Sequence, residues 1–309
     1  MAVVDASFQF LQWQALYSKQ KPYEVFLPAE SFQNKIPRSN LVFEPHSVRV
    51  HDVRTQRDEY TLDTHGFQFI RHITMVEDFK DRTVVQQSYI PEMERLLGQH
   101  LSQSQGGHGD AVRTVCFDFR LRESIDTDEF AKRNINLEDG FDRLLPATHP
   151  HIDQSTRGAV LRVKRHMGEE AEKLLKGRVR VINVWRPLAD VRSWPLALCD
   201  ARTVSPDDLV TCDIVRRRYV GETYFGKFNP AQKWHYLSGM TPEDVIFIKV
   251  YDSDQTVQVQ RKRFYCNSTQ DMCLTLLLCR IGCLHASFQL TDSPHPRVSI
   301  ELRILVFGG

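Results

Sequence analysis

The stretch "PRVSIELRILVF", residues 296–307, decides the fold because its two faces differ in chemistry. Alternate side chains of a β-strand point to opposite faces of the sheet. One face carries the aliphatic residues Val298, Ile300, Leu302, Ile304 and Val306. The other face begins with Arg297 and Ser299. The aliphatic face predicts packing against a hydrophobic layer, and the polar face predicts a strand that lines the interior of a barrel.

Other β-rich runs precede this stretch, with turn residues between them. They are "RVRVINVWRPL" (178–188), "WPLALCDAR" (194–202), "YVGETYFGKF" (219–228) and "DVIFIKVYD" (244–252), and further upstream "SVRVHDV" (47–53) and "RTVVQQSYI" (82–90). Their branched and aromatic residues are typical of strands. We therefore expect a strand-dense second half of the chain.

Two segments have helical spacing of apolar residues instead. They are "PEMERLLGQHL" (91–101), opened by a proline, and "RVKRHMGEEAEKLLKG" (162–177), ended by a glycine. No repeat, low-complexity tract or flexible linker divides the chain. We expect one domain over residues 1–309, with a mixed α/β part at 1–140 and a β core at 141–309. The predicted fold is mainly β with flanking helices, a jelly roll or barrel braced on one side.

The charge balance limits the class of partner. Lys and Arg number 40 against 39 Asp and Glu, so no overall field attracts nucleic acid or an anionic membrane. No run approaches the roughly 18 apolar residues of a membrane helix, and no secretory signal precedes the seven cysteines. We expect a soluble cytoplasmic protein with a small-molecule partner, and leave a homodimer open.

The stretch "ATHPHIDQST", residues 147–156, carries a metal-binding signal. It places His149, His151 and Asp153 at alternate positions. In a strand, residues two apart lie about 6.6 Å apart and residues four apart about 13 Å, so all three cannot meet one ion at about 2.1 Å. His151 and Asp153 supply two corners of the triad of two histidines and a carboxylate that suits non-haem Fe(II). The alternatives are the pair of histidines, which omits the carboxylate, and a solvated surface turn.

A third ligand has to come from a distant part of the chain, and His285 is the candidate. Arg297 follows it by twelve residues, and Ser299 comes after that. A buried arginine needs an anionic partner, and its planar fork fits a carboxylate. His235 and His295 are rivals for the third ligand, but no Arg-x-Ser follows either at a suitable distance.

His-x-Asp, a distal His and then Arg-x-Ser recur in this order in Fe(II)/2-oxoglutarate oxygenases. Within that class the chain resembles the fungal hydroxylase/desaturase family that includes cephem-methoxylase-related proteins and gibberellin desaturases. The resemblance runs from about residue 20 to the end. It rests on "TLDTHGF", "RVRVINVWRPL", "WPLALCDAR", "KWHYLSGMTPEDVIFIKVYDSD" and "PRVSIELRILVF".

The resemblance implies a double-stranded β-helix of cupin type, the cofactors Fe(II) and 2-oxoglutarate, and dioxygen as the oxidant. It implies oxidation of a secondary metabolite, such as a terpenoid or meroterpenoid, by hydroxylation, desaturation or peroxide formation. By position it implies the metal ligands His151, Asp153 and His285 and a co-substrate anchor made of Arg297 and Ser299. Two other functions stay open: a cupin-like metal enzyme, dioxygenase or isomerase, that does not use 2-oxoglutarate, and a non-catalytic small-molecule binding protein.

Further site residues are predicted from the same motifs. Arg186, in "NVWRP", is predicted to reach the co-substrate or the substrate, and the alternative is a surface ion pair with Asp190. Phe67, Trp185 and Tyr224 are candidates for the wall of the substrate pocket, and the alternative is core packing.

One segment, about residues 256–283, departs from the family pattern, in which a short turn joins "YDSD" to the distal histidine. The segment contains Cys266, Cys273, Cys279 and Cys283. We interpret it as an insertion foreign to the fold, whose deletion the barrel should tolerate. A substrate lid and a zinc site are the alternatives, although the cysteines lack paired Cys-x-x-Cys spacing.

Overall fold

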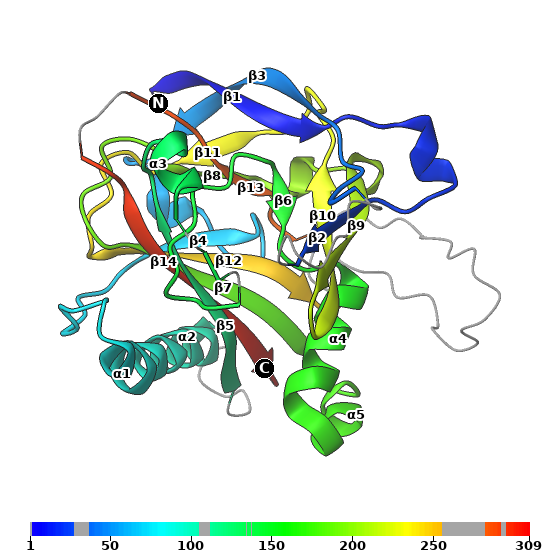
Figure 1. Ribbon diagram of the computed structural model, residues 1–309. Helices are drawn as coiled ribbons and strands as arrows, with labels where there is room; N and C mark the ends of the chain where they lie inside the picture. The colour runs from blue at the N-terminus through cyan, green and yellow to red at the C-terminus, as the bar shows by residue number, and fades with distance from the viewer. Residues whose placement is uncertain are drawn as a thin grey trace.

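The computed structural model describes residues 2–27, 37–104, 112–133, 135–136, 138–254, 282–291 and 295–309. Within these residues the chain forms two β-sheets that pack against each other, with helices beside the smaller one (Figure 1). The predicted insertion lies outside the described residues except for its last two, Gly282 and Cys283. Cys283 is fully buried, and its backbone N–H donates to the carbonyl of Lys249 at 2.8 Å. These two residues therefore belong to the fold.

The strands form one large and one small sheet. In spatial order the large sheet contains β1 (Val3–Leu11), β3 (Phe43–Asp52), β11 (Trp234–Tyr236), β8 (Leu196–Cys199), β13 (His285–Ser287), β6 (His151–Ile152), β10 (Tyr219–Gly226), β9 (Leu209–Arg216) and β2 (Tyr23–Phe26). The small sheet contains β4 (Phe67–Arg71), β12 (Asp244–Asp252), β7 (Val179–Pro187), β14 (Val298–Phe307) and β5 (Arg113–Glu123).

The chain crosses repeatedly from one sheet to the other. It runs β5, β6, β7, β8 with each strand in the opposite sheet from the last, and then β11, β12, β13, β14 in the same alternating way. The hairpin of β9 and β10 is inserted between these two halves and extends the large sheet. This winding is the predicted double-stranded β-helix, or jelly roll.

β14 has the two faces that its sequence predicts. Val298 is half-buried, and the aliphatic residues from Ile300 to Val306 pack with Met93 and Leu97 of a helix on the outer side of the small sheet. The inward face carries Arg297, Ser299, Glu301 and Arg303, which are all buried. Because β14 lies between β7 and β5, this polar row lies one strand in from the β5 edge of the small sheet.

The helices differ from the sequence prediction in two places. Residues 82–90, predicted as a strand, are helical: α1 (Arg82–Val84) and a π-helical turn, η4 (Val85–Tyr89), lead into α2 (Ile90–Ser104). Asp81 caps this helix by accepting from the N–H groups of Thr83 and Val84, a signal that branched residues masked. The π-helical turn ends at Tyr89, two residues before Pro91, which has no N–H to continue an α-helical hydrogen-bond ladder.

The second predicted helix is longer and interrupted. It begins at Thr156 with Ser155 as its cap and is α4 (Thr156–Met167), η5 (Gly168–Glu170) and α5 (Ala171–Leu174). Gly168 has φ +53°, a left-handed conformation that ends the first segment. The remaining short helices are η1 (Ala15–Ser18), η3 (Arg57–Glu59), α3 (Thr127–Ala131), η6 (Ala201–Thr203) and η7 (Pro206–Asp208).

The predicted division at residue 140 does not separate two layers. Strands β1 to β3 lie at the two edges of the large sheet, and β4 and β5 form both edges of the small sheet. Within the described residues, no helix is long and apolar enough to cross a membrane.

Candidate metal and co-substrate site

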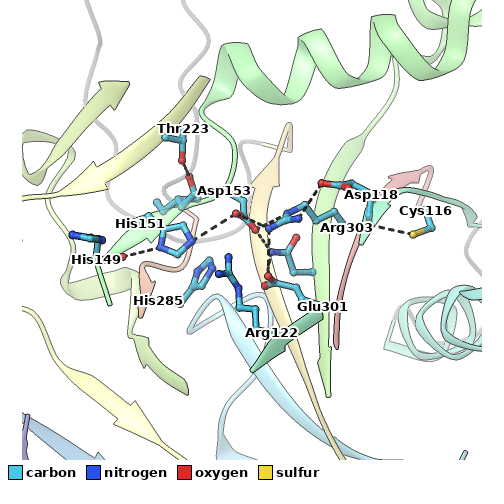
Figure 2. Close-up of polar contacts among 12 residues, drawn as sticks. Cys116, Asp118, Arg122, His149, His151, Asp153, Thr223, His285, Glu301 and Arg303 are labelled. Atoms are coloured by element: carbon cyan, nitrogen blue, oxygen red, sulfur yellow. Dashed lines mark hydrogen bonds and ion pairs between the residues drawn. The ribbon is translucent and has the colours of Figure 1, made fainter. Parts of the chain in front are cut away.

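Two neighbouring strands of the large sheet bring three metal-binding side chains together. His151 lies in β6, Asp153 follows that strand directly, and His285 of β13 pairs in register with His151. One ligand atom from each residue lies within 4.8 Å of the other two. His151 Nε2 is 3.7 Å from Asp153 Oδ1, and the two imidazole rings lie 4.5 Å apart (Figure 2). This group, the His151–Asp153–His285 cluster, has the residues and arrangement that the sequence predicts.

Backbone carbonyls orient both imidazoles. His151 Nδ1 donates to the carbonyl of His149 at 2.8 Å, and His285 Nδ1 donates to the carbonyl of Cys283 at 3.0 Å. A ring that donates from Nδ1 keeps the lone pair of Nε2 for a metal. Burial lowers the pKa of His151 to about 3, and His285 beside it acts in the same direction, so the ring stays neutral. His285 Nε2 is buried and has no hydrogen-bond partner among the described residues.

The carboxylate of Asp153 is held by a network of polar residues (Figure 2). Arg303 donates from Nε to Oδ2 at 3.0 Å and from Nη2 to Oδ1 at 3.2 Å, and the amide of Asn183 also donates to Oδ2. Burial alone would raise the pKa of Asp153, but the charge of Arg303 and the imidazoles keep it well below its ordinary value. Asp118 at 3.0 Å and Glu301 at 3.4 Å hold Arg303 in turn. Asp153 is thus a charged, oriented carboxylate with Oδ1 facing His151.

Arg297 has unsatisfied donors in the interior. It is 1% exposed, donates from Nη1 to Ser287 Oγ at 3.2 Å, and lies 5.6 Å from the ring centre of Trp185. Its Nε and Nη2 atoms, which form one edge of the guanidinium, have no partner among the described residues. Burial lowers the pKa of Arg297 to about 9, and the positive charge of Arg122 acts in the same direction. Ser299, two residues along the same face of β14, is also 1% exposed. This pair suits a carboxylate that approaches edge-on.

Arg186 does not join this site. It lies on the opposite face of β7 from Trp185 and donates to Tyr89 Oη at 3.1 Å and to the carbonyl and Nδ1 of His72 at 3.0 and 2.8 Å. It also donates to the carbonyl of Pro242. Arg186 is fully buried, and its hydrogen bonds join β7 to Tyr89 and His72. The predicted contact with the co-substrate or substrate and the alternative surface ion pair with Asp190 are therefore both wrong.

The predicted pocket aromatics have other positions. Phe67 and Trp185 pack in one buried cluster between the sheets, and Tyr224 is half-buried against another. A cavity of about 280 Å³ opens beside the metal cluster, and none of these three residues lines it. Phe225, the neighbour of Tyr224 on β10 and also a pocket candidate by its sequence, does line the cavity, as does His149.

The other histidines lie apart from the cluster. His149 packs against Phe43 with ring centres 3.9 Å apart and is among the residues that line the cavity, and its carbonyl accepts from His151 Nδ1. His235 packs against Tyr60 and Phe67. His295 is exposed.

Sequence reasoning missed the network around Asp153. Arg303 is register-paired with Asn183 of β7 on one side and with Asp118 of β5 on the other. The signal was the continuation of the polar alternation in β14, from Arg297 and Ser299 to Glu301 and Arg303. Arg303, Asn183 and Asp118 come from three strands, β14, β7 and β5. The sequence of β14 alone does not show which residues of the other two strands lie beside Arg303.

Comparisons with known proteins agree with this geometry. The family model described as Oxidoreductase/YMDC permease-like domain (YDMC) matches residues 8–271. The chain is 30% identical over 281 residues to the Fe(II)/2-oxoglutarate-dependent dioxygenase nvfI of Aspergillus novofumigatus, covering 88% of this chain and 87% of that protein. It is 31% identical over 280 residues to the hydroxylase/desaturase CTB9 of Cercospora beticola, covering 86% and 77%.

A solved structure is similar over the full length. The iron and alpha-ketoglutarate-dependent endoperoxidase NvfI, in a structure described as having a different conformation, superposes with a TM-score of 0.76 at 27% identity. The match covers 100% of this chain and 99% of that one.

Proposed function

The chain belongs to the family of the YDMC oxidoreductase model and of fungal Fe(II)/2-oxoglutarate-dependent dioxygenases and hydroxylase/desaturases, and on this premise we propose that it oxidises a C–H bond of a secondary metabolite with Fe(II), 2-oxoglutarate and dioxygen. Hydroxylation, desaturation and endoperoxidation are the outcomes named for its relatives. A terpenoid or meroterpenoid is the proposed substrate.

One observation carries the proposal: buried donors and acceptors without partners meet at one site. His285 Nε2 and the Nε and Nη2 atoms of Arg297 are buried and unsatisfied among the described residues. Such atoms cost about 1–3 kcal/mol each unless a ligand satisfies them. A metal ion on the imidazole and a carboxylate on the guanidinium satisfy all three. Two imidazole nitrogens and one carboxylate oxygen are the donor set that suits non-haem Fe(II).

The residues have separate roles in this proposal. With Fe(II) and 2-oxoglutarate bound, the pair supplies the oxidising chemistry, in which dioxygen converts 2-oxoglutarate to succinate and carbon dioxide. His151, Asp153 and His285 hold the metal, and Arg297 with Ser299 binds the distal carboxylate of 2-oxoglutarate. Arg303 keeps Asp153 charged and fixed, so that the ligand set does not depend on proton uptake by the carboxylate.

The cupin-like alternative without 2-oxoglutarate has no use for Arg297. An enzyme of that kind would retain the metal cluster, but two buried guanidinium donors would remain unsatisfied. A non-catalytic binding protein would have no need of two imidazoles whose Nδ1 atoms are both fixed by carbonyls.

The test is succinate formation measured with and without Fe(II) and 2-oxoglutarate. We expect succinate only when both are present. Arg297→Gln should raise the KM for 2-oxoglutarate by roughly tenfold or more, because a charge-assisted pair is lost. Arg186→Gln is the matched control. It removes an equally buried guanidinium from the face of β7 opposite to Trp185 and Arg297, and it should leave the KM for 2-oxoglutarate unchanged. Fe(II) binding with no 2-oxoglutarate turnover would contradict the proposal.

A further inference from the structure

The cavity beside the metal cluster is lined by an excess of arginine. Its volume is about 280 Å³, and His151 and Asp153 form part of its wall. The arginines that line it are Arg120, Arg122, Arg162, Arg216 and Arg303. They come from β5, α4, β9 and β14, four elements that meet only in the folded chain. Clefts lined by one sign of charge concentrate ligands of the other sign.

Four carboxylates line the wall, and three of them form ion pairs with cations other than Arg122 and Arg162. The four are Glu24, Asp118, Asp153 and Glu222. Arg303 binds both Asp118 and Asp153. Glu222 forms an ion pair with Lys21, which does not line the cavity. Three of the four carboxylates thus have an ion-pair partner other than Arg122 and Arg162.

Arg162 has no hydrogen bond or ion pair among the described residues, and its Nε is buried without a partner. Its guanidinium lies 4.3 Å from the ring centre of Tyr219 and 5.2 Å from that of Phe117. The aromatic rings hold the group in place but satisfy none of its N–H donors in the plane.

Arg122 is similar. Its Nη1 donates to the carbonyl of Leu145 at 2.7 Å, and no described carboxylate lies within ion-pair distance of it. In Figure 2 it lies beside His285, next to the metal cluster. Burial lowers the pKa of both Arg122 and Arg162, as expected for guanidinium groups whose charge is not fully compensated.

We propose that this cavity binds a carboxylate of the organic substrate, with Arg162 as its main partner and Arg122 as the second, so that the enzyme acts on an organic acid. The inference rests on the proposed function, because the cavity is the substrate pocket only if the cluster holds the catalytic metal. A single negative charge fits better than a phosphate dianion, since Glu24 remains in the same wall. The bound acid is not 2-oxoglutarate, whose proposed anchor, Arg297, does not line this cavity.

The experiment compares an aromatic acid with its neutral amide. 1-Naphthoate, benzoate and the two corresponding amides are titrated into the protein by calorimetry, without oxygen and with Fe(II) and saturating 2-oxoglutarate, so that the co-substrate site is filled. We expect at least one of the acids to bind, and its amide to bind at least roughly tenfold more weakly. Arg162→Gln should weaken binding of the acid by a similar factor and leave the amide unchanged.

Two controls make the result specific. Arg165→Gln removes the same charge from an exposed position on α4 that does not line the cavity, and it should bind the acid like the parent protein. Circular dichroism establishes that each variant is folded, and Arg162→Lys, which keeps the charge, should recover part of the affinity. Arg297→Gln should retain binding of the acid while its succinate formation requires roughly tenfold more 2-oxoglutarate.

Equal binding of acid and amide, no binding of either acid, or unchanged affinity in Arg162→Gln overturns the inference. Loss of acid binding in Arg297→Gln but not in Arg162→Gln also overturns it, because the probe would then occupy the co-substrate site. Failure of the proposed function gives a different result. In that case the acid still binds through Arg162, but neither the parent protein nor any variant forms succinate.

Discussion

Replacing Arg303 with methionine should lower both the stability of the metal-free protein and its affinity for Fe(II). The change removes a guanidinium that bonds Asp153 at 3.0 and 3.2 Å, Asp118 at 3.0 Å and Glu301 at 3.4 Å, and it leaves a side chain of similar length. Arg303 is 8% exposed, so water does not replace these bonds effectively. Three carboxylates then lose the cation that they share.

The magnitude follows from the burial of these groups. Breaking a buried ion pair from one side costs about 3–5 kcal/mol. An unfolding entropy of roughly 2.1 cal/mol/K per residue gives about 0.65 kcal/mol/K for 309 residues. The Tm of the metal-free protein should therefore fall by roughly 5–8 °C at pH 7. The pKa of Asp153 is lowered in the folded state, so its contribution is present above its unfolded pKa of about 3.9 and is lost as the pH falls below that value.

The affinity of Arg303→Met for Fe(II) should also fall, because Asp153 loses the side chain that orients its carboxylate. Loss of a hydrogen-bonding partner of a metal ligand typically weakens binding by about 10–100-fold. Without Arg303, burial raises the pKa of Asp153, so the affinity of the variant for Fe(II) should also increase with pH more steeply than that of the parent protein. Anaerobic calorimetric titration with Fe(II) at two pH values measures both effects.

Lys249→Met provides the matched control. Lys249 is a buried cation, 5% exposed, that bonds Asp63 at 2.6 Å and Asp252 at 3.2 Å and touches no residue of the metal cluster. This variant should lose stability but keep the parent affinity for Fe(II). If Arg303→Met binds Fe(II) as tightly as Lys249→Met does, Arg303 does not position the ligand and the reasoning fails.

Three further predictions follow. His151→Ala and Asp153→Ala should each abolish succinate formation with little change in the far-UV circular dichroism spectrum. His149→Ala should retain most activity, because its ring is not one of the proposed metal ligands. An inactive His149→Ala beside an active His151→Ala would refute this. Trp185→Leu should raise the KM for 2-oxoglutarate by roughly 2–10-fold through loss of a cation–π contact, and an unchanged KM would exclude that role. Burial lowers the pKa of His235 to about 4, so the unfolded chain takes up its proton first as the pH falls, and the free energy of unfolding should decrease between about pH 6.5 and 4. Urea denaturation of His235→Gln should show a shallower decrease, and a slope identical to that of the parent protein would contradict this.

The sequence predicts the β core well where hydrophobic periodicity is undisturbed. The run from Asp244 to Asp252 is a strand with those bounds, and β14 has one aliphatic and one polar face, as expected. Periodicity failed at residues 82–90, where branched residues favour a strand but the cap at Asp81 and the packing of Val85 and Tyr89 decide for a helix. A local propensity of a few tenths of a kcal/mol per residue does not outweigh such packing.

Some residues of the candidate site could likewise be predicted from the sequence, and others could not. His151 and Asp153 are close in sequence, and spacing alone shows that they are able to share an ion. Arg186 was assigned wrongly because the face that it occupies on β7 depends on the helix packed against that sheet, which the sequence does not display. The sequence does not single out Arg162 and Arg122, since they come from α4 and β5 and meet only at the cavity.

The most direct test of the account is anaerobic titration of the protein with Fe(II) and 2-oxoglutarate, followed by the visible absorption that Fe(II) acquires when a 2-oxo acid chelates it. We expect one Fe(II) and one 2-oxoglutarate per chain and loss of the absorption in His285→Ala. Arg297→Gln should retain Fe(II) but bind 2-oxoglutarate more weakly. Absorption that persists in His285→Ala, or Fe(II) binding in the parent protein with no absorption on adding 2-oxoglutarate, would contradict it.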